Sequence, residues 1–251
     1  MAIALEICVD DAEGIRTAVA TGVDQIELCA ALALGGLTPP PGLMRQAAGC
    51  GLPVHAMIRP RPGDFLFSAD DLQAALDDIR AVRAAGLAGV VIGASRHDGR
   101  LDAEALARQA EAAGDNMRVT LHRAFDVAPD ADEALETAIA LGIDRIMTAG
   151  HAPTAAAGAA ELSHLMRIAG GRVAIMAGGG IEPSDAAVLV AAGVDELHAA
   201  CRVLRPAAGP LGSLQIAAGR PVTDGAAIAR LQAAIRAAEA DRLVAELGKQ
   251  D

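Results

Sequence analysis

Two short apolar segments of the sequence each carry a carboxylate two residues before a thiol. Glu6 and Cys8 belong to the segment LEIC, and Glu27 and Cys29 belong to the segment IELC further along the chain. A carboxylate in apolar surroundings can acquire a raised pKa and act as a general acid or base. Thiolates are soft ligands that select Cu(I) over harder ions. The pattern therefore indicates either proton transfer or soft-metal binding.

Both pairs are expected to point toward the same side of a sheet. Successive side chains of a strand face opposite sides, and the aliphatic residues between the polar ones are expected to pack against helices. Glu6 and Cys8 then share the other face of one strand, and Glu27 and Cys29 share it on the next. We expect the two carboxylates to form one layer and the two thiols to form the layer above it.

The elements that must position these residues follow a repeated pattern. Ala-rich, helix-favouring stretches lead through a Gly into short apolar runs at residues 20–28, 84–92, 140–148 and 191–199. The whole chain offers eight candidate strands, at residues 3–8, 25–29, 54–58, 89–93, 118–122, 145–149, 173–177 and 194–199. Helical stretches such as 70–86 and 130–142 lie between them and begin with acidic residues.

Eight alternations of strand and helix in 251 residues predict a (β/α)8 TIM barrel. The competing fold, a doubly wound open sheet, is disfavoured because no G-x-G-x-x-G motif follows the first strand. We expect one domain over residues 1–251, with the barrel ending near residue 201. A long loop over residues 202–222 then leads to Asp224, which caps a C-terminal helix that closes the barrel.

Other polar residues stand at the carboxyl ends of the predicted strands, which is the functional end of such barrels. They are Arg59, Arg61 and Asp64 after the third strand, His122 and Arg123 after the fifth, and His198 on the eighth. Gly178, Gly179 and Gly180 follow the seventh strand and expose backbone N–H groups that suit an anion. Together they predict a pocket for a small phosphate- or carboxylate-bearing ligand.

Composition argues against several classes of partner. The net charge of -11 provides no positive field for nucleic acid or an anionic membrane, and a chain with no Trp or Tyr and three Phe lacks a base-stacking platform. The uncharged run at 28–44 contains glycines and prolines and is too short to span a bilayer. We expect a cytoplasmic protein with reduced cysteines.

Seven motifs carry a resemblance to the CutC family, often described as copper homeostasis proteins. They are LEICVD, DQIELC, GGLTP, MIRPRPGDF, LHRAFD, MAGGGI and ELHAA, in this order down to about residue 202. The resemblance implies a TIM barrel and copper handling, with Cys8 and Cys29 as the ligands. It also implies a shared set of mouth residues: Glu6, Glu27, Arg59, Arg61, Asp64, His122, Arg123, Asp126 and His198. Ala149 and Ala199 depart from the family, which often has hydroxyl residues there, and Pro62 stands where a Gly is common.

Two functions of different classes remain open. In the first, Cys8 and Cys29 bind Cu(I) from adjacent strands, with Cβ atoms roughly 5 Å apart. In the second, an enzyme acts on a small anionic metabolite by acid/base chemistry, with the catalytic groups drawn from Glu6, Glu27, His122 and His198.

Structural roles for the same residues are equally open. The buried carboxylates need partners, such as Arg59 or another inward cation, and the thiols can be small buried hydrophobes. His55 begins its strand far from the mouth and is interpreted as a core histidine. A homo-oligomer, with a dimer as the expected form, is the remaining prediction.

Overall fold

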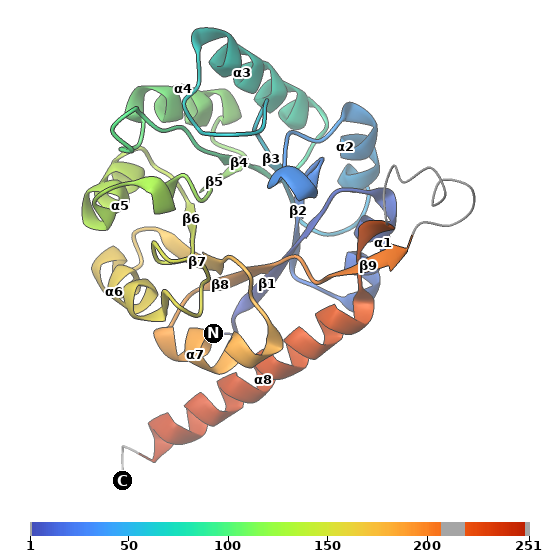
Figure 1. Cartoon of the computed structure of the whole chain (residues 1–251), viewed down its shortest axis with the longest axis vertical. Helices are drawn as coiled ribbons and strands as arrows, with labels where there is room; N and C mark the ends of the chain where they lie inside the picture. Colours follow the sequence, from blue (N-terminus) through green and yellow to red (C-terminus); the bar gives the residue numbers. More distant parts are fainter. Residues whose placement is uncertain (1, 207–218, 249–251) are drawn as a thin grey trace.

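Eight parallel strands form a closed barrel in sequence order, and helices surround it (Figure 1). The computed structural model of the chain describes residues 2–206 and 219–248. The strands are β1 (Ala4–Val9), β2 (Gln25–Leu28), β3 (Val54–Met57), β4 (Gly89–Ile92), β5 (Arg118–Leu121), β6 (Arg145–Thr148), β7 (Ala174–Gly178) and β8 (Glu196–Ala199). The predicted TIM barrel is confirmed, because each strand lies at its expected place in the chain.

The helices occupy the outer ring between successive strands. They are α1 (Ala12–Thr21), α2 (Pro41–Ala48), α3 (Ala69–Ala84), α4 (Ala103–Ala113), α5 (Ala131–Ala140), α6 (Ala159–Ala169) and α7 (Ala186–Ala192), followed by the C-terminal α8 (Gly225–Leu247). Short 3-10 turns precede some of them: η1 (Leu32–Leu34), η2 (Phe125–Val127) and η3 (Pro183–Asp185). Side chains cap most helix starts, as when Asp130 accepts from the backbone N–H of Glu133.

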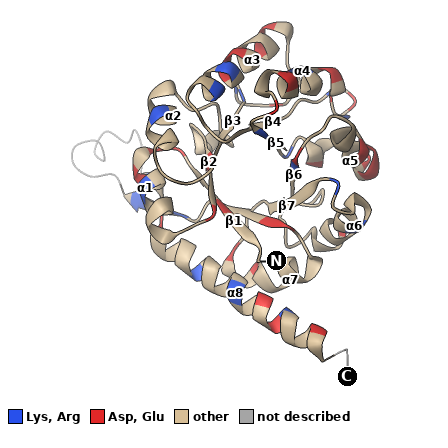
Figure 2. Cartoon of the chain, turned by 180° about the vertical axis from the view of Figure 1, so that it is seen from behind, with Lys and Arg blue, Asp and Glu red and all other residues tan. Residues whose placement is uncertain are grey.

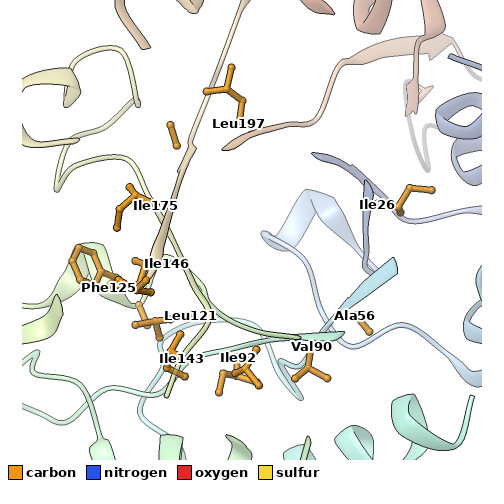
Figure 3. Packing of buried hydrophobic residues seen from close by; sticks show 14 of the residues in the cluster. Ile26, Ala56, Val90, Ile92, Leu121, Phe125, Ile143, Ile146, Ile175 and Leu197 are labelled. Atoms are coloured by element: carbon orange, nitrogen blue, oxygen red, sulfur yellow. The ribbon is translucent and has the colours of Figure 1, made fainter. Parts of the chain in front are cut away.

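The hydrophobic core lies between the barrel and the helices. Ile26, Ile92, Leu121 and Ile146 are fully buried on alternate strand positions and face the helical layer (Figure 3). Their strand neighbours consequently face the barrel axis, as the alternation predicts. Figure 2 shows most charged positions on the outer helices and an acidic position of β1 inside the ring. That position is Glu6, which is 1% exposed.

The register between β1 and β2 differs from the prediction. Cys8 lies opposite Glu27, and Glu6 lies opposite Gln25. The prediction that the carboxylates share one layer and the thiols share the next is therefore wrong. Side-chain alternation fixes only which face a residue occupies, whereas the stagger between tilted barrel strands fixes its height. The residue that pairs with Cys8 on β2 is consequently Glu27 and not Cys29.

The segment after β8 is more structured than the predicted loop over residues 202–222. Its described ends form an antiparallel hairpin of β9 (Arg202–Pro206) and β10 (Gly219–Thr223), and residues 207–218 lie outside the described part. Arg205 and Arg220 of the hairpin both pair with Glu13 of α1. The hairpin is therefore attached to the outside of the barrel near β1.

Helix α8 takes the eighth position of the outer ring, as predicted. It begins after Asp224, whose side chain accepts from the backbone N–H of Ala227, and it packs against α7 and α1. Ile228 and Ile235 are buried there, whereas Leu243 in the last turns is 56% exposed (Figure 1). No helix within residues 2–206 and 219–248 is long and apolar enough to cross a membrane.

The packing of α8 yields a stability prediction. Ile235→Ala removes a side chain that is 4% exposed, so we expect a loss of about 2–5 kcal/mol from the lost burial and the cavity left behind. Leu243→Ala, on the same helix but exposed, is the matched control and should cost less than about 0.5 kcal/mol. Urea denaturation measures both changes. Equal losses for the two variants would show that α8 does not close the ring.

Candidate functional site

A cavity of about 680 Å³ opens at the carboxyl ends of the strands. Eight of the predicted site residues line it: Cys8, Glu27, Arg59, His122, Arg123, Gly179, Gly180 and His198. The other six do not: Glu6, Cys29, Arg61, Asp64, Asp126 and Gly178. Met57, Phe65 and Met147 also line the cavity, together with Arg202 of β9 and Arg230 of α8. Their place in the wall depends on the paths of the loops and of the C-terminal segment, which strand alternation alone does not give.

The floor below the cavity contains a buried ionic cluster centred on Arg145. Its guanidinium, on β6, is 0% exposed and donates to Glu6 Oε2 at 2.9 Å, to Glu196 Oε2 at 2.6 Å and to Thr120 Oγ1 at 2.9 Å. We call Glu6, His55, Thr120, Arg145 and Glu196 the floor cluster. Arg145 is thus the inward cation that the buried carboxylates require.

Sequence reasoning named Arg59 as the candidate partner of these carboxylates and missed Arg145. The signal was present, because Arg145 occupies an inward position of the sixth predicted strand. Arg145 begins its strand, however, whereas the predicted mouth residues stand at the carboxyl ends of the strands.

Glu6 is held as a carboxylate by its partners. Burial alone raises the pKa of a carboxyl, but the charge of Arg145 and hydrogen bonds with His198 and His55 outweigh it and place the pKa of Glu6 well below its ordinary value. Glu6 Oε2 lies 3.0 Å from His55 Nδ1, and Glu6 Oε1 lies 2.9 Å from His198 Nδ1. His55 is the core histidine that was predicted. Glu6 is therefore suited to positioning its neighbours rather than to releasing or taking protons.

His198 connects the floor cluster to the cavity. Because Glu6 engages its Nδ1, the Nε2 atom is directed to Glu27, whose Oε2 lies 3.8 Å away. Burial lowers the pKa of a histidine, but the charges of Glu27 and Cys8 and the hydrogen bond with Glu6 raise the pKa of His198 well above its ordinary value. The partly buried His198 ring therefore favours its protonated form, and the residue lines the cavity.

Glu27 has one oxygen without a partner. Cys29 Sγ donates to Glu27 Oε2 at 3.3 Å, while Oε1 is buried and has no hydrogen-bond partner in the described part of the chain. Burial raises the pKa of Glu27, and the charge of His198 counteracts this only in part. A carboxyl of this kind exchanges protons more readily near neutral pH than an exposed one does.

Cys29 and Cys8 have different surroundings. Burial and the Glu27 charge raise the pKa of the Cys29 thiol well above its ordinary value, so this thiol stays protonated and acts as a hydrogen-bond donor. Cys8 instead lines the cavity, and its sulfur, a carboxylate oxygen of Glu27 and a ring nitrogen of His198 lie within 4.8 Å of one another. These three donors are close enough together to hold a metal ion.

His122 is a neutral hydrogen-bond donor at the cavity wall. Its Nδ1 accepts from the backbone N–H of Ala124 at 3.0 Å, so the ring proton is on Nε2. Burial and the nearby charge of Arg59 lower the pKa of His122 to about 3. The ring packs on Phe65 with centroids 4.6 Å apart.

Arg59 fixes the loops at the mouth. Its Nη1 donates to the carbonyls of Leu34 and Gly36, and its Nη2 donates to the carbonyl of Gly63 at 2.6 Å. These contacts tie the loop after β2 to the loop after β3. The side chain is only 6% exposed and still lines the cavity.

Arg61 and Asp64 serve the loop after β3 and do not reach the cavity. Arg61 pairs with Asp64 at 3.0 Å and with Asp71 at 3.1 Å, and it donates to the carbonyl of Leu66. Asp64 is mostly exposed and accepts from the backbone N–H of Leu66. Both residues therefore shape the loop that carries Phe65.

Asp126 organises the turn after β6. It accepts from the hydroxyl of Thr148 and from the backbone N–H groups of Ala149 and His151, and it pairs with Arg123 Nε at 2.6 Å. The Ala at position 149 therefore takes part through its backbone, which needs no side-chain hydroxyl. Asp126 aims the Arg123 guanidinium without lining the cavity itself.

The glycines after β7 allow close approach of other groups. A Cβ on Gly178 would lie 2.8 Å from Met147 Cγ, and one on Gly179 would lie 3.1 Å from Arg123 Nη1. Gly179 and Gly180 also have positive φ angles of 127° and 64°, which favour glycine. The Arg123 guanidinium thus lies directly over this turn, and a cation and open backbone meet at one edge of the cavity.

The chain is similar to known proteins over most of its length. A model of the CutC family matches residues 3–203. A family protein CutC from Agrobacterium fabrum is 49% identical over 238 residues, covering 93% of this chain and 94% of the relative. One from Caulobacter vibrioides is 48% identical, covering 93% of this chain and 97% of the relative.

Solved structures are similar as well. A crystal structure of CutC from Streptococcus agalactiae, named for copper homeostasis, superimposes with a TM-score of 0.74 at 27% identity and covers 78% of this chain and 97% of that one. A thiamine phosphate pyrophosphorylase from Pyrococcus furiosus has a TM-score of 0.60 at 15% identity, covering 94% of this chain and 96% of that one, and shows the fold alone.

The floor cluster yields a second stability prediction. Arg145→Met leaves the Glu6 and Glu196 carboxylates buried without their cation, so we expect a loss of about 3–5 kcal/mol in the free energy of unfolding. Arg80→Met is the matched control, because Arg80 is 53% exposed and pairs with Asp77 at the surface; it should cost less than about 1 kcal/mol. Urea denaturation at neutral pH measures both. A loss below about 1 kcal/mol for Arg145→Met would contradict the central role of this cation.

Proposed function

The chain belongs to the CutC family, and on this premise we propose that it is a barrel enzyme that acts on a small anionic metabolite by proton transfer. One observation carries the proposal: a buried carboxyl of raised pKa, Glu27, presents an oxygen with no partner among the described residues beside the fixed imidazolium of His198. Such a pair offers a base and an acid in one water-poor site.

Each residue near the pair has a role in this proposal. Glu27 takes a proton from the substrate, and His198 stabilises the developing negative charge or returns a proton. Glu6, held by Arg145, keeps His198 oriented and charged. His122 donates a hydrogen bond from Nε2. Buried acid/base groups of this kind typically contribute about 10²–10⁴-fold to a rate.

The anionic part of the substrate is proposed to lie at the Arg123 edge of the cavity. Arg123 and the backbone of Gly179 and Gly180 line that edge, and the guanidinium carries the charge that a phosphate or carboxylate requires. Arg61, Asp64, Asp126 and Gly178 support the surrounding loops in this scheme, and Arg59 ties the mouth loops together from within the cavity wall.

The proposal predicts the effect of one substitution. Glu27→Gln removes the base and keeps the shape, so turnover should fall by about 10²–10⁴-fold while substrate affinity changes little. A thermal-shift screen of phosphorylated and carboxylated metabolites identifies ligands of the wild type, and turnover is then measured on those ligands. Glu104→Gln, an exposed carboxyl on α4, is the control and should leave the rate unchanged. Undiminished turnover in Glu27→Gln would refute the assignment.

Copper binding is the second candidate, and a different observation favours it. Cys8, Glu27 and His198 offer a sulfur, an oxygen and a nitrogen within 4.8 Å of one another. The Glu6–His198 contact resembles the carboxylate–histidine pairing that orients metal ligands. The copper homeostasis name of the Streptococcus agalactiae relative agrees with this role. Cys29 fits less well, since its protonated thiol already bonds Glu27.

The two cysteines should therefore differ in copper affinity. We expect Cys8→Ser to weaken Cu(I) binding at least tenfold and Cys29→Ser to weaken it by less than about threefold, because thiolate is the soft ligand and only Cys8 belongs to the donor group. Competition with a colorimetric Cu(I) chelator measures both. Cys50→Ser, outside the cavity, is the control. Equal weakening by Cys8→Ser and Cys29→Ser would restore the two-thiol site.

The compartment and the oligomeric state are also part of the proposal. We place the protein in the cytoplasm with reduced cysteines, in accord with its acidic composition. We also propose a homodimer, for which the exposed apolar residues Leu243, Val244 and Leu247 at the end of α8 are the candidate contact.

A further inference from the structure

Four buried polar atoms of residues that line the cavity have no hydrogen-bond partner among the residues that the structure describes. They are Glu27 Oε1, Arg59 Nε, His122 Nε2 and Arg202 Nε. The first is an acceptor and the other three are donors. Buried donors without partners are uncommon and costly in native proteins, so each requires a reason. Two of these donors, Arg59 Nε and His122 Nε2, belong to side chains that pack on the same Phe65 ring.

The position of His122 depends on a glycine in the neighbouring strand. A Cβ on Gly93 would lie 2.0 Å from His122 Cε1 and 2.5 Å from His122 Nε2, so the imidazole occupies the space that a side chain at position 93 would need. Ile92 pairs with Leu121, which makes Gly93 and His122 the next residues along β4 and β5. The ring therefore lies across β4 toward β3.

Arg59 reaches the same place from β3. Met57 pairs with Val91, so Arg59 and Gly93 stand at the same height two residues further on. The Arg59 Cζ atom lies 5.3 Å from the centroid of the Phe65 ring, on which His122 also packs. Both Nη atoms of Arg59 are engaged by backbone carbonyls, which leaves Nε–H as the donor available to a ligand.

We propose that Arg59 Nε–H and His122 Nε2–H form an oxyanion hole that binds the carbonyl oxygen of the substrate. The substrate class is then a small compound with a carbonyl group and a hydrogen on the adjacent carbon. This inference rests on the proposed function, because it supplies the electrophilic half of the proton transfer assigned to Glu27.

The step balances without a further reactant. Glu27 takes the proton from the carbon next to the carbonyl, and a new O–H bond forms on the carboxyl as the C–H bond breaks. The released electron pair forms a carbon–carbon double bond, and the carbonyl becomes an enolate oxygen held by the two donors. Return of the proton to the same or the other carbon completes an exchange or an isomerisation. A neutral imidazole is an effective electrophile here, as in triosephosphate isomerase.

Glycolohydroxamate, a planar mimic of an enediolate, tests the oxyanion hole by calorimetry. The full-length protein is first treated with EDTA, so that chelation of a metal cannot account for binding. We expect the wild type to bind and His122→Leu to bind about 100-fold more weakly. His122→Gln, which can place an amide N–H near the Nε2 position, should recover most of the affinity. Gly93→Ala should also weaken binding, and His164→Leu on α6 is the control.

A spectroscopic measurement separates contact from a structural effect. In protein labelled with ¹⁵N-histidine, the His122 nitrogens should keep the chemical shifts of a neutral imidazole protonated at Nε2 down to about pH 5, since the pKa of His122 is about 3. The Nε2 signal should shift when the mimic is added, whereas a histidine with only a packing role would leave it unchanged. This readout does not require the His122 variants to fold.

The possible outcomes distinguish this inference from the proposed function. Absence of binding by the wild type, or full binding by both His122→Leu and Arg59→Lys, overturns the oxyanion hole even if Glu27→Gln abolishes turnover. If binding of the mimic depends on His122 but Glu27→Gln leaves turnover unchanged, the proposed proton transfer is wrong. The oxyanion hole formed by Arg59 and His122 is then still supported.

Discussion

The site depends on one guanidinium placed inside the barrel. Arg145 is fully buried and pairs with both Glu6 and Glu196, and its charge helps to hold the pKa of Glu6 well below its ordinary value. Glu6 in turn engages His198, and His198 faces Glu27. Charge therefore alternates from the floor to the cavity, and each group sets the protonation of the next.

Much of the fold could be predicted from the sequence because two patterns depend only on residues close together in the chain: the alternation of side chains along a strand and the repeated helix-to-strand joint. Alternation along a strand identified Glu6, Cys8, Glu27 and His198 as inward side chains, and the helix-to-strand joints identified the eight strands. The register that pairs Cys8 with Glu27 did not follow, since stagger is a property of the closed barrel and not of any one strand. The same alternation places Arg145 on an inward position of the sixth strand, so this residue could also be predicted from the sequence.

The loop residues show a different limit of prediction. Arg59, Arg61, Asp64 and Asp126 all stand near strand ends, yet only Arg59 lines the cavity. A charged side chain in a loop can satisfy backbone groups or face a ligand, and its residue type is the same in both cases. Which occurs depends on the path of the loop, as with Asp126 and the turn at Ala149. Spacing in the sequence does not encode that path.

The closure of the barrel between β1 and β8 has a consequence for synthesis of the chain. The contact between Glu6 and His198 joins residues 192 positions apart, and the contact between Glu6 and Arg145 spans 139. A ribosome must therefore release the chain beyond residue 145 before Glu6 can meet Arg145, and beyond residue 198 before Glu6 can meet His198. Contacts of such high sequence separation are slow to form. A partly made chain that ends before residue 198 carries Glu6, Cys8, Glu27 and Cys29 but lacks the histidine that connects them to the floor cluster.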